Sequence, residues 1–136
     1  MPAGYSGRPL AAKLGLRPGQ RAYASGMPEN VAAEIAADLP EFDFAVEPAE
    51  GLDIAHVFTA SRAELEAQLA RLRPLLAPAG MIWVSWPKKA SKVPTDIIED
   101  TIRELAFPLG LVDVKVCAVD DIWSGLKLVV RKALRG

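Results

Sequence analysis

Apolar residues dominate the middle of the chain, where the run from Met81 to Trp86 is interrupted by only one polar residue, Ser85. A short run rich in Ile, Val and Trp predicts a strand covered on both faces, and such strands lie in the middle of parallel sheets. Pro87 has no N–H to donate, so we expect the strand to end there. A loop with three lysines follows. We therefore expect this strand to open into a basic loop at the carboxyl edge of a sheet.

Two strand–helix units precede this strand. The pattern predicts a strand from Arg21 to Ser25 and a helix from Glu29 to Leu39, in which apolar residues recur every four positions. It predicts a second strand from Asp53 to Thr59 and a second helix after Ser61. Ser61 and Glu64 have the spacing of a capping box, in which each side chain accepts from the other residue's backbone N–H. Leucines form the apolar face of this helix: Leu65, Leu69, Leu72 and Leu76.

The pattern changes after the basic loop. Thr95 is predicted to cap a third helix, with Asp96 near its positive end. The runs from Leu111 to Val119 and from Leu126 to Arg131 are rich in β-formers, and the joint between them, DDIWSG, is so short that only an antiparallel pair fits. The chain is therefore predicted to be an α/β protein, a three-layer αβα sandwich whose mostly parallel, Rossmann-like sheet ends in an antiparallel C-terminal hairpin.

The segment from Phe42 to Val46 leaves two interpretations open. Its composition suits a strand, but the link from Glu47 to Leu52 is too short for the crossover helix that usually joins parallel neighbours. Either that link is stretched, or the segment is not a parallel strand.

Length and charge limit the classes of function. The 136 residues suit one domain, with residues 1–17 as an N-terminal arm carrying a short helix near Leu10 to Leu14, and residues 18–136 as the domain itself. Within the arm, Gly4 to Gly7 is expected to be a flexible opening. A net charge of −1 and a pI of about 5.8 argue against a nucleic-acid-binding protein.

The cysteine content and the hydropathy of the chain suggest the cellular compartment of the protein. A single cysteine, Cys117, allows no intrachain disulfide and suits a reducing environment. The first residues lack the apolar core of a signal peptide, and no apolar run approaches the roughly 20 residues of a membrane helix. We therefore expect a cytoplasmic protein with no membrane partner.

The order of elements resembles the class I methyltransferase fold, in which an otherwise parallel sheet ends with an antiparallel strand; the resemblance covers roughly Pro18 to Lys132. More narrowly, three stretches resemble a small bacterial family known as domain of unknown function 3052. They are GYSGRPLAAKLGL near the start, WVSWPKKASKVPTD in the middle and GLVDVKVCAVDDIWSGLKLV near the end. This second resemblance spans the whole chain and implies no established activity.

The methyltransferase resemblance makes S-adenosylmethionine a candidate cofactor. In such folds a glycine-rich loop after the first strand lets the backbone approach the cofactor, and a carboxylate after the next strand holds the ribose. The corresponding loop here is Ser25-Gly26-Met27-Pro28, with one glycine and one proline, and Glu47 is the candidate carboxylate. The loop therefore departs from the pattern where the cofactor would bind.

Candidate ligand-binding residues follow from the rule that open α/β sheets bind ligands beyond the carboxyl ends of their strands. The lysines of the basic loop, next to the start of a helix, suit a phosphate or a carboxylate. A tryptophan in the expected hairpin turn is a candidate to close over that loop. The predicted set is Ser25, Gly26, Trp86, Lys88, Lys89, Ser91, Lys92, Thr95, Trp123 and Ser124.

Other reactive residue types favour structural roles. His56, the only histidine, lies between apolar residues of a strand and is interpreted as a core histidine. Cys117 is interpreted as a small buried hydrophobe, and one cysteine with one histidine gives no basis for a zinc site. Asp120 and Asp121 are expected to satisfy backbone groups in a turn. No catalytic residue is predicted.

Three functional hypotheses remain. The first is a domain of this fold without catalysis of its own, which binds a small anionic ligand or a protein partner at the carboxyl edge of the sheet. The second is a divergent S-adenosylmethionine-dependent methyltransferase. The third is a structural or oligomeric module, in which Trp123 and the C-terminal hairpin pair with another copy.

Overall fold

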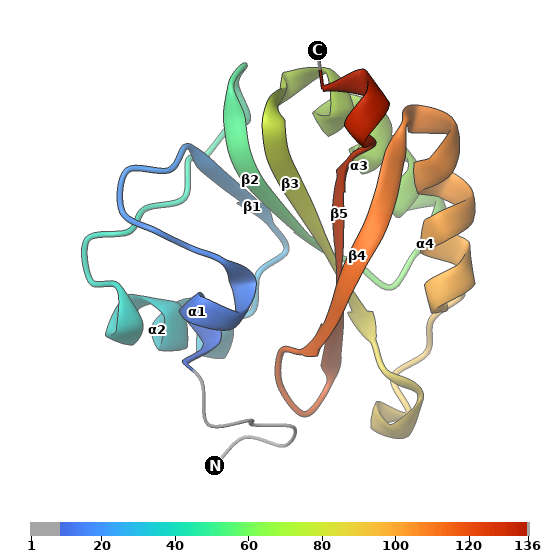
Figure 1. Cartoon of the computed structure of the whole chain (residues 1–136). Helices are drawn as coiled ribbons and strands as arrows, with labels where there is room; N and C mark the ends of the chain where they lie inside the picture. The colour runs from blue at the N-terminus through green and yellow to red at the C-terminus, as the bar shows by residue number, and fades with distance from the viewer. Residues whose placement is uncertain (1–8, 136) are drawn as a thin grey trace.

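The computed structural model of the chain describes residues 9–135 and places one five-stranded sheet between two layers of helices (Figure 1). The expected segment Gly4 to Gly7 lies outside the described residues. The helices are α1 Leu10–Leu14, α2 Glu29–Asp38, α3 Arg62–Leu72 and α4 Glu99–Ala106. The strands are β1 Ala22–Ser25, β2 Leu52–Phe58, β3 Leu76–Pro87, β4 Leu111–Ala118 and β5 Trp123–Val130.

The strand order confirms the predicted fold class. The order is β1-β2-β3-β5-β4; β1, β2 and β3 are parallel, and β5 runs antiparallel to both β3 and β4. In Figure 1, α1 and α2 lie to the left of the sheet, and α3 and α4 lie to the right. The sheet is therefore the middle layer of a three-layer αβα sandwich with a mixed C-terminal edge.

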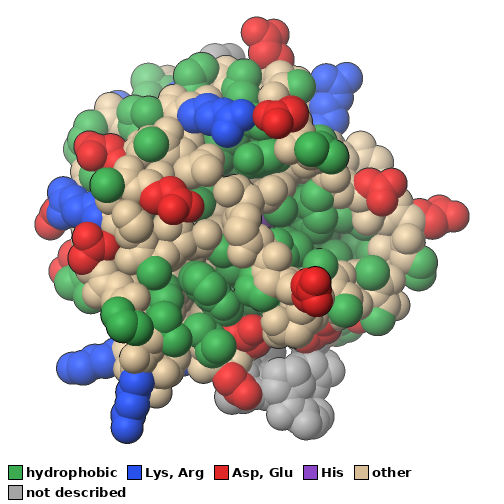
Figure 2. Space-filling model, turned by 180° about the vertical axis from the view of Figure 1, so that it is seen from behind, with side chains coloured by type: hydrophobic (Ala, Val, Ile, Leu, Met, Phe, Trp, Pro, Cys, Tyr) green, Lys and Arg blue, Asp and Glu red, His purple; other side chains and the backbone are tan. Residues whose placement is uncertain are grey.

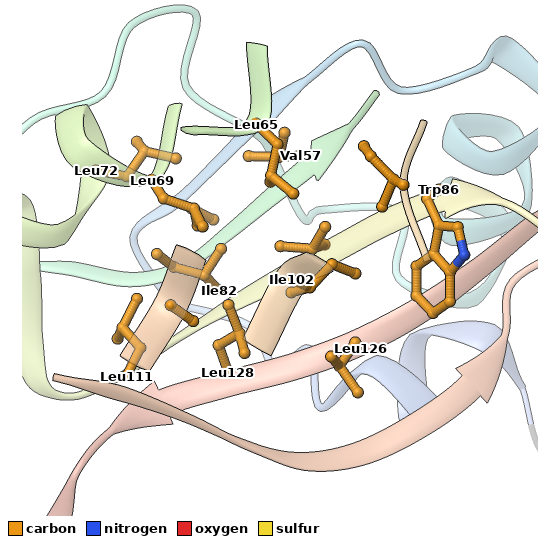
Figure 3. Close-up of a cluster of buried hydrophobic side chains, with 14 of the residues drawn as sticks. Val57, Leu65, Leu69, Leu72, Ile82, Trp86, Ile102, Leu111, Leu126 and Leu128 are labelled. Carbon is orange, nitrogen blue, oxygen red and sulfur yellow. The ribbon is translucent and has the colours of Figure 1, made fainter. Parts of the chain in front are cut away.

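Successive side chains of each strand point to opposite faces of the sheet, so the core is divided into two clusters. On the side of α3 and α4, aliphatic side chains of the strands and helices point toward one another (Figure 3). On the side of α1 and α2, the cluster contains Trp83, Phe58 and Cys117 beside aliphatic residues. Burying one Leu or Ile side chain stabilises the fold by about 1.5–3 kcal/mol, so both layers hold the sheet.

The short helix α1 packs against the sheet with Leu10, Ala11 and Leu14 buried. Its C-terminal end is fixed by the indole of Trp83, whose Nε1 donates to the carbonyl of Leu14 at 2.9 Å. Helix α1 is therefore part of the core packing, although the sequence places it in the N-terminal arm.

The segment from Phe42 to Val46 is not a full strand. It makes a single parallel bridge, in which Ala45 pairs with Tyr23 and the Ala45 N–H donates to the Ala22 carbonyl at 2.7 Å. This resolves the problem of the short link, because a one-residue bridge needs no crossover helix. The bridge lies on the side of β1 opposite to β2.

Helix α3 begins as predicted and ends early. The Ser61 hydroxyl accepts from the Glu64 N–H at 3.2 Å, but the Ser61 N–H donates to Thr59 Oγ1 at 3.1 Å, so the reciprocal half of the capping box is absent. The helix ends at Leu72 because Pro74 follows in a 3-10 turn. Leu76 therefore belongs to β3, and its assignment to the helical face was wrong.

The C-terminal hairpin is confirmed, but its turn is shorter than expected. Strand β5 begins at Trp123, which pairs with Pro87, while Ser124 pairs with Trp86. Asp120 closes the turn, since its carboxylate accepts from the N–H groups of Ile122 and Trp123 at 2.8 Å each. The expectation that Trp123 lies in the turn was therefore wrong.

Among residues 9–135, no helix is both long enough and apolar enough to cross a membrane.

Candidate functional site

The topology creates a switch point between β1 and β2. After β1 the chain visits the Ala45 bridge on one side and then crosses to β2 on the other. In open α/β sheets, ligands bind in the crevice beyond the carboxyl ends of the strands at such a point. Here Ser25 ends β1, Gly26 follows it and Thr59 follows β2; we call this place the crevice.

Gly26 turns the chain against the neighbouring strand. Its φ of 70° lies in the region that favours glycine, and a Cβ at this position would stand 2.6 Å from the carbonyl oxygen of Phe58. The glycine thus permits close approach of this turn to the end of β2.

Ser25 is tied to helix α3. Its hydroxyl accepts from Gln68 Nε2 at 3.2 Å, while Gln68 Oε1 is the one buried side-chain oxygen or nitrogen without a partner in the described part of the chain. The amide therefore approaches the crevice from the helix side. Its unpaired oxygen is an acceptor that the sequence pattern did not identify.

Glu47, the candidate ribose carboxylate, points elsewhere. It pairs with Arg71 at 3.1 Å, one helical turn beyond Gln68 toward the end of α3. Both side chains are about half exposed or more. Glu47 is thus engaged away from Ser25.

The place that an anion would take at the start of α3 is filled by the chain itself. Asp96 Oδ1 accepts from the Arg62 N–H at 2.7 Å, and the Thr95 hydroxyl donates to the Ala60 carbonyl at 2.7 Å. A helix N-terminus favours a negative charge, and here Asp96 supplies it. Thr95 therefore anchors the loop to the end of β2 and is not the cap of α4, as the sequence had suggested.

Helix α4 begins four residues later than Thr95. Its N-cap is Ile98, whose N–H donates to Thr101 Oγ1 at 3.2 Å. Asp96 consequently lies outside this helix, and only Glu99 and Asp100 occupy its first turn. The sequence had placed the start too early because Thr95 is a favourable capping residue whose hydroxyl instead bonds to the Ala60 carbonyl.

An open groove of about 360 Å³ lies between the end of β3 and the start of α4. We call it the lysine groove; its walls include Trp86, Lys89, Lys92, Thr95, Ile98 and Glu99. The indole of Trp86 is buried at its base, whereas Ile98 is 64% exposed. The groove thus joins apolar walls to two ammonium groups.

The basic loop is ordered by its own hydrogen bonds. The Ser91 hydroxyl donates to the Lys88 carbonyl at 2.7 Å and accepts from the Val93 N–H at 3.2 Å. Lys92 adopts a positive φ of 61°, which is uncommon for a residue other than glycine. Ser91 shapes the loop, and among its lysines Lys89 and Lys92, but not Lys88, line the groove.

The acidic first turn of α4 shares one arginine with a carboxylate of β4. Arg103 pairs with Glu99 at 2.8 Å, with Asp100 at 2.9 Å and with Asp113 at 3.1 Å. These hydrogen bonds, that of Asp113 first, raise the pKa of the guanidinium. The acids beside the groove therefore pair with Arg103 and not with the lysines, and Lys89 and Lys92 have no ion pair among residues 9–135.

Trp123 and Ser124 pair with residues at the end of β3, beside the groove, but they do not line it. The Trp123 ring packs edge-on against Phe58, with 5.4 Å between centroids, on the α1 and α2 side of the sheet. Trp86 belongs to the opposite cluster. The predicted set thus divides between the crevice, the lysine groove and the far face of the sheet.

His56 and Ser85 form a buried pair that the sequence pattern did not connect. His56 Nε2 and Ser85 Oγ lie 2.7 Å apart, and the imidazole stacks on Phe58 with 4.1 Å between centroids. Burial lowers the pKa of His56 to about 3, so it is neutral at physiological pH. The pair joins β2 to β3 inside the core; the signal was a polar residue within an apolar run of each of two adjacent strands.

Comparisons with known proteins establish the fold. No protein-family model matches the chain, so the resemblance to the domain of unknown function 3052 family stays a prediction. A comparison with curated proteins likewise finds no match. Solved structures do match, and several methyltransferases and two fibrillarins are among them.

Two of these structures serve as examples, and both match most of the chain. Magnesium protoporphyrin IX methyltransferase from Synechocystis, solved with bound S-adenosylmethionine, has a TM-score of 0.58 at 15% identity over 90% of this chain and 74% of its own. A TehB-like S-adenosylmethionine-dependent methyltransferase from Corynebacterium glutamicum has a TM-score of 0.53 at 12% identity over 95% of this chain and 91% of its own. The chain therefore has a methyltransferase-like Rossmann fold.

A third match is partial. The fibrillarin pre-rRNA processing protein of Methanococcus jannaschii has a TM-score of 0.49 at 12% identity over 80% of this chain, which spans only 55% of that protein. At identities this low, similarity concerns the fold, and the activity has to be argued from the site.

Proposed function

We propose that the chain is a methyltransferase-like binding domain without catalysis of its own, which takes an anionic and partly apolar ligand in the lysine groove. The ligand is a small molecule or a segment of a partner protein. The observation that carries the proposal is the contrast at the carboxyl edge: the start of α3 is occupied by Asp96 and the turn at Gly26 packs against the Phe58 carbonyl, whereas the groove beside β3 is open.

The surface chemistry supports this proposal. Lys89 and Lys92 offer ammonium groups to an anion, while Val93 and Ile98 leave apolar surface in water at 39% and 64% exposure. Figure 2 shows hydrophobic side chains gathered over much of the rear face of the molecule, with acidic side chains scattered among them. Exposed apolar areas are typical of surfaces that bind a ligand or a partner.

A titration followed by NMR of backbone amides tests the groove. The probes are phenylacetate, as a small anion, and the peptide Glu-Leu-Glu-Leu-Glu, as a stand-in for a partner segment. We expect saturable shifts in residues 86–99 and a loss of affinity of about tenfold in the variant Lys89→Ala/Lys92→Ala, because hydrogen bonds to charged groups are the strong ones.

Lys88→Ala is the matched control, since Lys88 belongs to the same loop but does not line the groove. It is expected to bind as the unmodified protein does. Equal losses in both variants would indicate a nonspecific charge effect, and an absence of shifts in residues 86–99 would reject the groove.

A divergent S-adenosylmethionine-dependent methyltransferase is the second candidate. It is favoured by the switch point between β1 and β2 and by the similarity to a methyltransferase that was solved with bound S-adenosylmethionine. Calorimetric titration with S-adenosylmethionine and S-adenosylhomocysteine separates the two candidates. Micromolar binding to either compound would favour the enzyme, and no heat at millimolar ligand would favour the binding domain.

A further inference from the structure

A large open cavity lies away from the carboxyl edge. It measures about 510 Å³ and lies on the α1 side of the sheet, near the amino ends of β2 and β3. Met81 and Val129 form an apolar floor, and Arg17, Lys127 and Asp53 contribute charged groups. This volume is within the range of small-molecule sites, and the lining is more polar than apolar.

Lys127 is an unusual residue for its position. It lies on β5, between β3 and β4, where it pairs in register with Trp83 on one side and with Lys115 on the other. Lysines directly opposite each other on paired strands repel and destabilise the sheet. Lys127 is half-buried and has no ion pair within residues 9–135. The fold thus places two like charges opposite each other, and an anion beside Lys127 would offset their repulsion.

The neighbouring lysines increase the positive potential. Lys115 Nζ donates to the Lys13 carbonyl at 3.2 Å, and Lys13 Nζ donates to the Ala118 carbonyl at 2.9 Å. Both ammonium groups are therefore held by backbone carbonyls and not by carboxylates. Their charges also oppose the rise in the pKa of Cys117 that burial causes, as expected if both lie near its thiol.

Arg17 stands on a loop that hydrogen bonds hold in place over the cavity. Gln20 Nε2 donates to the Gly15 carbonyl at 3.2 Å, and Gln20 Oε1 accepts from the Arg17 N–H at 2.9 Å. The guanidinium itself forms no ion pair in the described part of the chain. A fixed loop therefore presents a second unpaired cation to the same cavity as Lys127.

Asp53 is the one acidic side chain among the described residues that line the cavity. Its carboxylate accepts from the Arg21 N–H at 2.8 Å. Asp53 lies on β2 and Lys127 on β5, two strand positions apart, or about 10 Å at the usual spacing. An anion beside Lys127 is thus separated from this carboxylate, whose charge is already partly satisfied.

We propose that this cavity is a second ligand site, which takes a small organic phosphate, with the phosphate between Arg17 and Lys127 and the apolar part on Met81 and Val129. The site goes beyond the lysine groove, since it lies on another face and near the opposite ends of the strands. Two unpaired cations above an apolar floor suit a ligand that combines a multiply charged group with an apolar body.

Titration with phenyl phosphate, followed by NMR of backbone amides, tests the site. We expect saturable shifts in residues 17–20 and 127–129, and weaker binding of inorganic phosphate, which lacks the apolar part. Lys127→Met is expected to weaken binding of phenyl phosphate at least about tenfold, since it removes a charge-assisted hydrogen bond. Lys132→Met removes a lysine outside the cavity and is expected to leave the affinity unchanged.

Stability supplies a second readout. Removing one of two opposed lysines is expected to leave the melting temperature of Lys127→Met equal to or above that of the unmodified protein. If that variant unfolds, Arg17→Gln replaces it, because Arg17 is exposed and its guanidinium holds no ion pair within residues 9–135. The same tenfold loss is expected there.

The results separate this site from the lysine groove. Shifts confined to residues 86–99 would support the groove and overturn the second site. Equal affinity in Lys127→Met and Lys132→Met, or the absence of shifts near 17–20 and 127–129, would also overturn it. Shifts at both places would support both proposals.

Discussion

The crevice beyond β1 and β2 and the lysine groove beyond β3 lie along one edge of one sheet, but the chain treats them differently. In the crevice, Gly26 packs against the Phe58 carbonyl and the Asp96 carboxylate binds the Arg62 N–H. In the groove, Lys89 and Lys92 have no counter-ion within the described part of the chain. The topology determines where ligands can approach, and the loops determine whether the place is free.

One segment produces both halves of this contrast. The loop after β3 supplies Lys89 and Lys92 to the groove, and a few residues later it supplies Thr95 and Asp96 to the segment between β2 and α3 beside the crevice. Its extended path to α4 crosses the carboxyl end of β2. Closing the crevice and building the groove are therefore linked through the position of this loop.

The largest effect is expected from Gly26→Ala, which tests how tightly the crevice is closed. The new Cβ would meet the Phe58 oxygen at 2.6 Å in a backbone conformation that suits glycine. We expect a loss of about 3 kcal/mol in the free energy of unfolding, from strain and from the enforced separation of β1 and β2. Urea denaturation measures it.

Gly19→Ala is the matched control for this substitution. Gly19 has a φ of 89°, but nothing lies within 4 Å of the added Cβ. Only backbone strain remains there, so a loss of about 1 kcal/mol is expected. Equal losses in the two variants would show that the contact with Phe58 is not tight, and the crevice would then be open to a ligand.

Asp96→Ala tests the internal anion. It removes the acceptor of the Arg62 N–H and the negative charge at the start of α3, so we expect a loss of about 1–2 kcal/mol. Asp96→Asn keeps an acceptor and loses only the charge, so a smaller loss is expected. If both variants unfold as the unmodified protein does, Asp96 does not stabilise α3 and the place is available to an external anion.

Much of the fold could be predicted from the sequence because local patterns and the final packing agree. The apolar run at Met81, the capping serine at Ser61 and the short hairpin joint each specified their element. The N-cap of α4 was placed wrongly because Thr95 has the local chemistry of a capping residue. Its hydroxyl is taken by a long-range contact with the Ala60 carbonyl, which no local pattern contains.

The sequence predicted where the candidate site lies, but only some of the residues that form it. The rule for parallel sheets placed Trp86 and the lysines at the carboxyl edge. The closure by Asp96 and the separation of Trp123 from Trp86 depend on the path of the loop and on which face of the sheet each ring occupies. Residue spacing alone does not predict which face a ring occupies, because an error of one residue in the start of a strand moves every side chain to the other face.

The pH dependence of stability tests the buried pair of His56 and Ser85, which joins β2 to β3. The pKa of His56 falls from 6.5 to about 3 because the ring is buried, so the unfolded chain takes up a proton that the folded chain does not. The lowered pKa of His56 therefore costs no free energy of unfolding above pH 6.5. As the pH falls from 6.5 toward 3, the free energy of unfolding decreases by roughly 1 kcal/mol for each pH unit.

His56→Gln provides the comparison, because glutamine keeps a hydrogen-bonding group near Ser85 but does not titrate. Since the chain has one histidine, its contribution dominates the slope between about pH 5 and pH 6.5. Denaturation at several pH values should show a flatter slope in the variant. The same slope in both proteins would mean that His56 is protonated in the folded state.

The smallest effect is expected from Glu47→Gln, which tests whether this carboxylate belongs to the crevice at all. Its partner Arg71 is 49% exposed and Glu47 is 78% exposed, and exposed pairs contribute about 0–1 kcal/mol. We expect a loss below about 0.5 kcal/mol, and no change in the heat of titration with S-adenosylmethionine. A ribose-holding carboxylate would behave differently, since its removal would weaken cofactor binding while leaving stability almost unchanged. Calorimetry on the variant and on Arg71→Gln, which breaks the same pair from the other side, therefore distinguishes a surface ion pair from a residual cofactor site.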